Sequence, residues 1–286
     1  MSDSQTGTQG NAGRERLPGV KHIVAVGSGK GGVGKSTVAV NLAISLQATG
    51  AKVGILDADI YGPSIPMMLG VRDARPELVD QRTIAPIKGH GLSLISMGFM
   101  LKDSDAVVWR GPMLGKALQQ FIEDVNWGDL DYLVVDLPPG TGDVQLSLSQ
   151  MIPIDGAVVV TTPQDVAFAD VRRAIRMFEL TKVSLLGLVE NMSYFVAPDT
   201  QNRYDIFGTS QTPAHCESLS VPLLGELPID MQVGPCGDRG EPVCVADSDG
   251  EQAGIYMALA KKVIALMAKN DSMSSFQDFF AMKSSD

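Results

Sequence analysis

A glycine-rich loop placed between a strand and a helix is the feature that most constrains this chain. Residues 29–36 read Gly-Lys-Gly-Gly-Val-Gly-Lys-Ser and satisfy the pattern G-x-x-x-x-G-K-[ST]. They follow the apolar run 22–26 and precede residues 37–48, whose apolar positions have helical spacing. Backbone N–H groups that no side chain blocks can close around phosphate oxygens at a helix N-terminus. The sequence therefore predicts a phosphate-binding loop on a strand–helix unit.

The same glycines allow a second interpretation. Residues 27–32 also read G-x-G-x-x-G, and Asp57 ends the next apolar run, where a dinucleotide-binding fold places an acid for the ribose. A tight turn between strand and helix is a third explanation of the glycines. Neither alternative gives a role to the Lys-Ser pair that ends the loop or to Asp136, so the phosphate loop is favoured.

Short Val, Ile and Leu runs alternate with helical spacing along the rest of the chain, which is typical of an α/β fold with a mostly parallel sheet flanked by helices. We expect one domain over residues 19–269, between a disordered polar tail over 1–18 and a flexible C-terminal tail over 270–286. Strands are predicted at 22–26, 53–57, 92–96, 132–136, 157–161, 185–189 and 223–227. Helices are predicted at 37–48, 112–125, 143–151, 165–181 and 252–268.

Acidic residues follow two of these strands, at the edge of an open sheet where ligands collect. Asp57 and Asp59 follow the strand 53–57, and Asp136 ends the strand 132–136 as a Walker B acid would. Mg²⁺ prefers oxygen ligands and keeps several waters, so these carboxylates and the Ser36 hydroxyl suit a magnesium site. The backbone amide of Gly140 is placed to sense a γ-phosphate.

The loop and the motifs beyond it resemble a known family. Residues 30–36 have the deviant Walker A form, with a second lysine near the start of the loop, that nitrogenase iron protein and the MinD/ParA ATPases share. Residues 57–66, 109–113, 136–143, 162–166 and 190–195 further resemble motifs of the Mrp/ApbC iron–sulfur carriers, in the same order. The resemblance covers roughly residues 18–268.

This resemblance implies a P-loop ATPase of low turnover that works as a homodimer with ATP and Mg²⁺. Lys30 would reach the nucleotide of the partner subunit, as an arginine finger does, and Lys35 would bind the phosphates of its own subunit. Asp59 would orient the attacking water, and Ser36, Asp57 and Asp136 would hold Mg²⁺ and its waters. Nucleotide contacts are expected from Gly29, Lys30, Gly31, Gly32, Val33, Gly34, Lys35, Ser36, Thr37 at the α-phosphate, Gly140, and Asn191 at the adenine.

The chain departs from the family where a cluster would bind. Members usually follow the 190–195 motif with a Cys-x-x-Cys pair, but Ala197 and Thr200 stand at those positions. Neither side chain supplies the thiolate that iron–sulfur clusters require. The resemblance therefore does not identify the residues that would bind a [4Fe-4S] cluster. The remaining candidates are Cys216 with its neighbour His215, then Cys236 and Cys244, and we expect these thiols, like His22 and His90, to be structural.

Charge and composition limit the classes of partner that the chain is expected to bind. Lys and Arg number 23 against 33 Asp and Glu, and the net charge of −10 disfavours nucleic acid and anionic membranes. An odd count of three cysteines fits a reducing compartment, and no signal peptide or membrane span is recognisable. We therefore expect a cytoplasmic protein whose partners are a second copy and apo iron–sulfur proteins or assembly factors.

Three functions follow from these patterns. The favoured one is an ATPase that carries iron–sulfur clusters or assists their assembly, either with unusual ligands or as a nucleotide switch without a cluster of its own. A MinD-like spatial regulator is the alternative, although the C-terminal residues 275–282 have little basic charge for binding lipid. A reductase like nitrogenase iron protein needs the cysteine ligands that are missing here.

Overall fold

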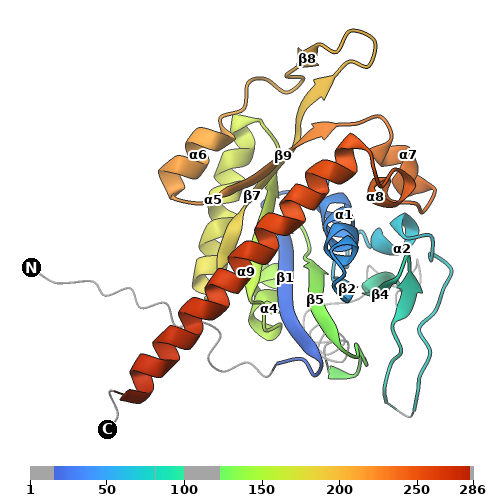
Figure 1. Cartoon of the computed structure of the whole chain (residues 1–286), viewed down its shortest axis with the longest axis vertical. Helices are drawn as coiled ribbons and strands as arrows, with labels where there is room; N and C mark the ends of the chain where they lie inside the picture. The colour runs from blue at the N-terminus through green and yellow to red at the C-terminus, as the bar shows by residue number, and fades with distance from the viewer. Residues whose placement is uncertain (1–15, 81, 100–122, 284–286) are drawn as a thin grey trace, which may run out of the picture.

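The computed structural model describes residues 16–80, 82–99 and 123–283. These residues form a mixed sheet of nine strands with helices on both faces (Figure 1). The motif at 109–113 and nearly all of the helix predicted at 112–125 lie outside the described residues. The division of the chain into a tail, a domain and a second tail stays a prediction.

The sheet has the order β3-β4-β2-β5-β1-β6-β7-β8, and β9 pairs with β7. All pairings are parallel except β3 with β4 and β7 with β8. The predicted α/β class and all seven predicted strands are confirmed, and the short β3 and β8 are additions. The strands are β1 Val20–Ser28, β2 Val53–Asp57, β3 Ile87–Gly89, β4 Leu92–Ser96, β5 Leu130–Asp136, β6 Gly156–Thr161, β7 Leu185–Val196, β8 Arg203–Tyr204 and β9 Leu223–Ile229.

The longer helices agree with the apolar spacing of the sequence, whereas short ones were not predicted because one or two turns carry too little periodicity. The C-terminal helix continues to Lys283, past the end predicted at residue 268. No helix within the described ranges is long and apolar enough to cross a membrane. The helices are α1 Lys35–Ala48, α2 Ile65–Met68, η1 Met97–Phe99, α4 Asp143–Met151, α5 Asp165–Leu180, α6 Thr212–Leu219, α7 Val233–Asp238, α8 Val243–Ala246 and α9 Glu251–Lys283.

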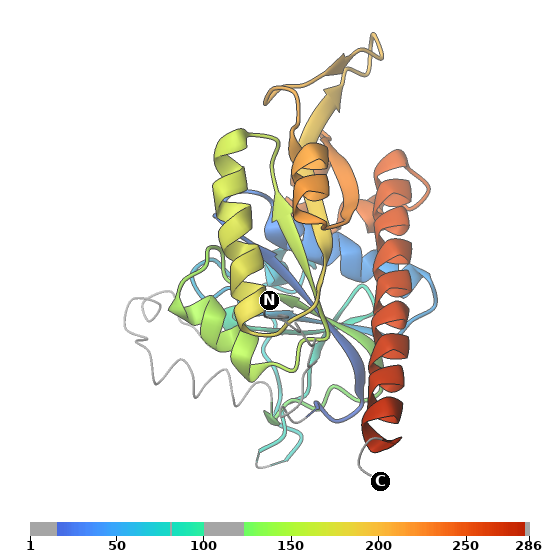
Figure 2. The same ribbon diagram turned by 90° about the vertical axis from the view of Figure 1, so that its left-hand side faces the viewer.

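The central strand β1 shows how the sheet separates two cores. Ile23 and Ala25 belong to the core shared with α4 and α5, whereas Val24 and Val26 belong to the core shared with α1 and α9. This alternation follows from the two-residue period of a strand, whose successive side chains point to opposite faces. Figure 2 shows the resulting layers, with α9 on one side of the sheet and α4 and α5 on the other.

Strand register brings the predicted site residues to one edge. Strands β2, β5 and β1 are parallel neighbours, and Asp57 of β2 lies beside Asp136 of β5. Asp136 in turn lies beside Val26 of β1, two residues before the end of that strand at Ser28. The glycine loop and both acids therefore meet at the carboxyl edge of the sheet.

Candidate nucleotide-binding site

The glycine loop lines a cleft at this edge of the sheet. The cleft has a volume of about 200 Å³, and loop residues, Asp59 and Pro139 are among those that line it. The loop residues in the lining are Lys30, Gly31, Gly32, Gly34, Lys35, Ser36 and Thr37. The structure thus brings together most of the residues predicted to contact phosphate.

Two glycines give the loop its shape. Gly32 and Gly34 have φ of 78° and 80°, in the left-handed region that glycine adopts without strain. A Cβ on Gly34 would also collide with the side-chain amide of Asn191. Gly34 is the N-cap of α1, so the free N–H groups of the first helical turn lie at the loop.

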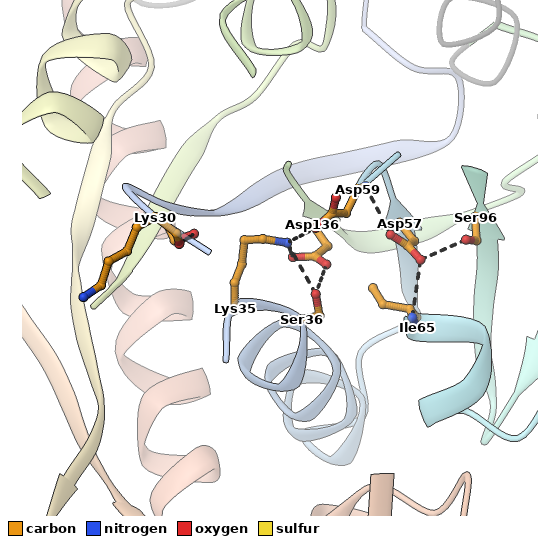
Figure 3. Close-up of polar contacts among 9 residues, drawn as sticks. Lys30, Lys35, Ser36, Asp57, Asp59, Ile65, Ser96 and Asp136 are labelled. Carbon is orange, nitrogen blue, oxygen red and sulfur yellow. Dashed lines mark hydrogen bonds and ion pairs between the residues drawn. The ribbon is translucent and has the colours of Figure 1, made fainter. Parts of the chain in front are cut away.

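Lys35 lies at the centre of a polar network (Figure 3). Its Nζ is 2.7 Å from Oδ1 of Asp136 and 3.4 Å from Oδ2 of Asp59. The Ser36 hydroxyl donates to the other oxygen of Asp136 at 2.6 Å. The lysine side chain is only 5% exposed, so these charges interact in a poorly hydrated place.

Asp57 is fully buried beside this network. Its Oδ2 accepts from the Ser96 hydroxyl at 2.8 Å and from the backbone N–H of Ile65 at 3.3 Å. Its Oδ1 accepts from the backbone N–H of Asp59 at 3.2 Å. Asp57 therefore ties β2, β4 and the start of α2 together.

Burial controls the ionisation of the two deepest acids. Loss of hydration raises the pKa of Asp57 to about 8, and the nearby negative charge of Asp136 adds to the shift. Burial also raises the pKa of Asp136, against the opposing effect of the Lys35 ammonium. The pocket thus holds more carboxyl groups than its single ammonium group neutralises.

Asp59 differs from its two neighbours because it faces the cleft. The residue is 7% exposed, and its Oδ1 is buried without a hydrogen-bond partner among the described residues. A buried carboxylate oxygen without a partner beside the phosphate cleft keeps its capacity to accept a hydrogen bond.

Several predicted contact residues lie behind the cleft instead of in its wall. Val33 is buried in the core between the sheet and α1, so only its backbone is available to a ligand. Asn191 donates from Nδ2 to the Val33 carbonyl at 2.9 Å and supports the loop from β7. The Gly140 N–H donates to the Ser28 carbonyl at 2.9 Å. Gly29 packs against the backbone of Asp170 in α5, where a Cβ would collide.

Lys30 has a different orientation from Lys35. In Figure 3 its ammonium group points away from the acidic network. No hydrogen bond or ion pair joins this ammonium group to any residue that the structure describes. Only the backbone of Lys30 is held, through the Ser28 hydroxyl, which donates to its carbonyl at 2.9 Å.

Sequence reasoning missed two groups that complete the site. Ser96 ends a predicted strand, yet nothing in the sequence indicates that β4 lies beside β2 with Ser96 opposite Asp57. The Ile65 N–H belongs to α2, a four-residue helix too short to have a periodic signal. The position of Ser96 at the end of a predicted strand was the only sequence signal that could have placed it near the site. No sequence signal indicated the role of the Ile65 N–H.

The three cysteines do not form a cluster site. All are free and buried, and Cys216 and Cys244 lie in the cores on opposite faces of the sheet. Burial raises the pKa of the Cys244 thiol to about 11 and that of Cys216 above its usual range, which disfavours the thiolate that binds metal. No group of three or more His, Cys, Asp or Glu in the described parts of the chain is arranged to hold a metal ion.

The positions of the missing cysteines lie in the turn between β7 and β8. The Ala197 N–H donates to the Asn202 carbonyl at 2.9 Å, and Thr200 is exposed. This hairpin projects from the body of the protein (Figure 1). Two of the histidines have structural contacts. His215 stacks on Phe168, and the Nε2 of His90 lies 2.7 Å from the Gly240 carbonyl.

A glycine loop that follows the central strand of a parallel sheet and carries a Lys-Ser pair next to a strand-end aspartate defines the P-loop NTPases. A family comparison narrows this class, because the profile of the NUBPL iron-transfer P-loop NTPases, a ParA group, matches residues 19–264. The chain belongs to this family.

Two relatives are named iron–sulfur cluster carrier proteins. The one from Deinococcus radiodurans is 56% identical over 245 residues, which cover 86% of this chain and 69% of the relative. The one from Aquifex aeolicus is 50% identical over 249 residues, which cover 87% and 68%. The resemblance to the Mrp/ApbC carriers is thereby confirmed.

Solved structures agree on the fold. A nucleotide-binding protein from Archaeoglobus fulgidus, in complex with ADP, has a TM-score of 0.73 and 37% identity and covers 84% of this chain and 94% of its own. The cell division ATPase MinD of Pyrococcus furiosus has a TM-score of 0.65 at 20% identity over 86% of this chain and 99% of its own, a likeness of fold alone.

Proposed function

We propose that this chain is a Mg-ATP-dependent, dimeric ATPase that serves the assembly or delivery of iron–sulfur clusters to apoproteins. The observation that carries the ATPase part is the contact of Lys35 and Ser36 with Asp136 at the base of the phosphate cleft. Titration calorimetry of the parent protein with Mg-ATP tests it, and we expect saturable heat. The family and the names of the relatives support the iron–sulfur part.

The donor set fits magnesium. Ser36 supplies a hydroxyl, and Asp57 and Asp136 supply carboxyl oxygens, which are the ligand types that Mg²⁺ accepts directly or through water. Three carboxyl groups face one ammonium group in this pocket. Burial raises the pKa of Asp57 and the charge of Asp136 adds to the shift, and a divalent cation would offset that charge. When bound, the metal would neutralise charge on the phosphates.

The remaining roles follow the geometry of the cleft. Lys35 would exchange Asp136 for phosphate oxygens, and the amides of residues 29–36 would surround them. Thr37, at the cleft wall, would contact the α-phosphate, and Gly140 would donate its N–H to the γ-phosphate. Asn191 lies behind the loop, so we propose that it reaches the adenine from that side while it supports Val33.

The free ammonium group of Lys30 supports a site completed by a second copy of the chain. We predict that Lys30→Ala keeps most of its ATP affinity but loses turnover and the ATP-stabilised dimer, because the charge acts on the partner's nucleotide. Phosphate release and light scattering after gel filtration with Mg-ATP measure the two effects. Lys88→Ala, at an exposed lysine on β3, is the control. A Lys30→Ala protein that dimerises and turns over like the parent would show that the lysine is a solvated loop charge.

The cluster would be cargo that this chain does not hold with its own cysteines. We predict that anaerobic reconstitution with iron and sulfide leaves the purified chain colourless, because all three thiols are buried and Cys216 lies on the opposite face of the sheet from Cys244. Visible absorption and labile-sulfide analysis measure this. Absorption that appears in the parent and disappears in a Cys216/Cys236/Cys244→Ser variant would instead assign the cluster to these thiols. A colourless result leaves the ATPase assignment intact and makes the chain the nucleotide-driven partner of another carrier.

A reducing, cytoplasmic location agrees with three unpaired cysteines and with the carrier relatives. We propose it together with apo iron–sulfur proteins or assembly factors as partners.

A further inference from the structure

Helix α4 carries an uncommon group on its buried face. Gln145 is 1% exposed, and neither its Nε2 nor its Oε1 has a hydrogen-bond partner among the described residues. The hydroxyl of Ser149, one turn further along the same helix, is also buried without such a partner. Buried amides in proteins are nearly always paired, so this arrangement of α4 is destabilised by its own side chains.

Gln145 lies against the strand that carries the phosphate loop. A Cβ atom added to Gly27 would lie 3.1 Å from the Nε2 of Gln145 and 3.1 Å from the ring of Phe178 in α5. Gly27 precedes the loop by only two residues on β1. The unpaired amide is therefore enclosed between α4, α5 and the strand that carries the loop.

The segment before α4 links this amide to the nucleotide site. Residues 137–142, which we call the switch loop, connect Asp136 to the first turn of α4, where Gln145 lies. In the structure the switch loop is bonded to β1 through the Gly140 N–H and the Ser28 carbonyl. The N-cap of α4, Gly142, has no side-chain capping bond, so movement of the loop can carry the first turn with it.

A γ-phosphate competes for both ends of this segment. It attracts Lys35, which here contacts Asp136, and it attracts the Gly140 N–H, which here contacts Ser28. The structure shows the switch loop bonded to β1, and on the proposed function a γ-phosphate would give the loop a second arrangement. A ligand favours one arrangement only through a difference in free energy between the two.

We infer that Gln145 is a positioning residue for the switch loop, unpaired when the loop is bonded to β1 and paired when the loop is bonded to the γ-phosphate. This inference rests on the proposed ATPase function. Pairing of the amide stabilises the closed loop in the complex with ATP. It does not stabilise the complex with ADP, because ADP has no γ-phosphate to hold the loop closed. The side chain thus helps the site to distinguish the two nucleotides without touching either.

Gln145→Met tests this because methionine keeps the length of the side chain and removes both polar atoms. We expect the melting temperature of the nucleotide-free protein to rise by about 2–4 °C, since an unpaired buried amide is gone. We expect affinity for Mg-ATPγS to fall about tenfold with affinity for Mg-ADP unchanged, measured by calorimetry. Gln145→Leu repeats the test if the methionine variant is insoluble.

Thr181→Val, at the C-cap of α5, is the matched control in the same layer. The Thr181 hydroxyl is buried and already bonded to the carbonyls of Met177 and Phe178, at 3.0 and 3.1 Å. Its removal should lower the melting temperature and leave both nucleotide affinities unchanged. A lower melting temperature in Gln145→Met would mean that the amide is already paired and would overturn the inference, as would an unchanged ratio of the two affinities. A parent protein that binds neither nucleotide would instead refute the proposed function.

Discussion

Lys35→Ala is expected to abolish measurable binding of Mg-ATP. The Lys35 ammonium lies 2.7 Å from Asp136 and 3.4 Å from Asp59 in a buried place. Its removal deletes an attractive charge for phosphate and leaves buried carboxylates unpaired, so the cleft repels the nucleotide. Truncating one partner of a buried charge pair in a binding site typically costs about 2–5 kcal/mol, which corresponds to a loss of affinity of roughly 30-fold to several thousand-fold.

Calorimetry with Mg-ATP measures this loss, and circular dichroism shows whether each variant is folded. Lys35→Met retains most of the buried volume and serves if the alanine variant unfolds. Lys88→Ala is the control, because Lys88 also has a short polar contact, 2.6 Å from its Nζ to the Ser93 hydroxyl, but lies outside the cleft. Equal affinity of Lys35→Ala and the parent would contradict the assignment of the phosphate loop.

Asp59→Asn is expected to bind Mg-ATP and hydrolyse it about 100- to 1,000-fold more slowly. Asp59 lines the cleft, and its buried Oδ1 has no partner in the described part of the chain, so we expect this oxygen to accept a hydrogen bond from the attacking water once the nucleotide is bound. Asparagine keeps the volume but offers a weaker acceptor without charge. The substitution weakens the 3.4 Å ion pair with Lys35 but keeps the backbone N–H that donates to Asp57 and the contact of Lys35 with Asp136, so we expect binding to be retained.

Single-turnover release of phosphate, measured beside calorimetric affinity, separates the chemical step from binding. Asp129→Asn, at an exposed aspartate in the loop before β5, is the control for removal of one negative charge. Normal turnover in Asp59→Asn would move the water-positioning role to another group of the cleft.

Much of the fold followed from local patterns. Each long apolar run became a strand because continuous burial on both faces needs no information from elsewhere in the chain. Helix α1 ends at Ala48, where the predicted helix 37–48 ends, and Gly50 follows with φ of 95°, a left-handed conformation typical of a glycine after a helix. Helices of four to eight residues and the two-residue β8 were beyond such patterns, since they owe their conformation to the surfaces they pack against.

Some parts of the candidate site could likewise be predicted from local patterns, and others could not. The phosphate loop could be predicted from the sequence, because it needs only eight consecutive residues and the glycine torsions of a strand–helix turn. The sequence also located Asp57 and Asp136 at strand ends.

The contacts between distant residues could not be predicted in this way. Asp136 contacts Lys35, Ser96 and the Ile65 N–H hold Asp57, and Gln145 is enclosed without a partner among the described residues. The tertiary structure likewise separates Cys216 from Cys244 by the full thickness of the sheet layer. Residues a hundred positions apart meet according to the order and register of the strands. That order results from the cooperative burial of the whole sheet, and no single segment encodes it.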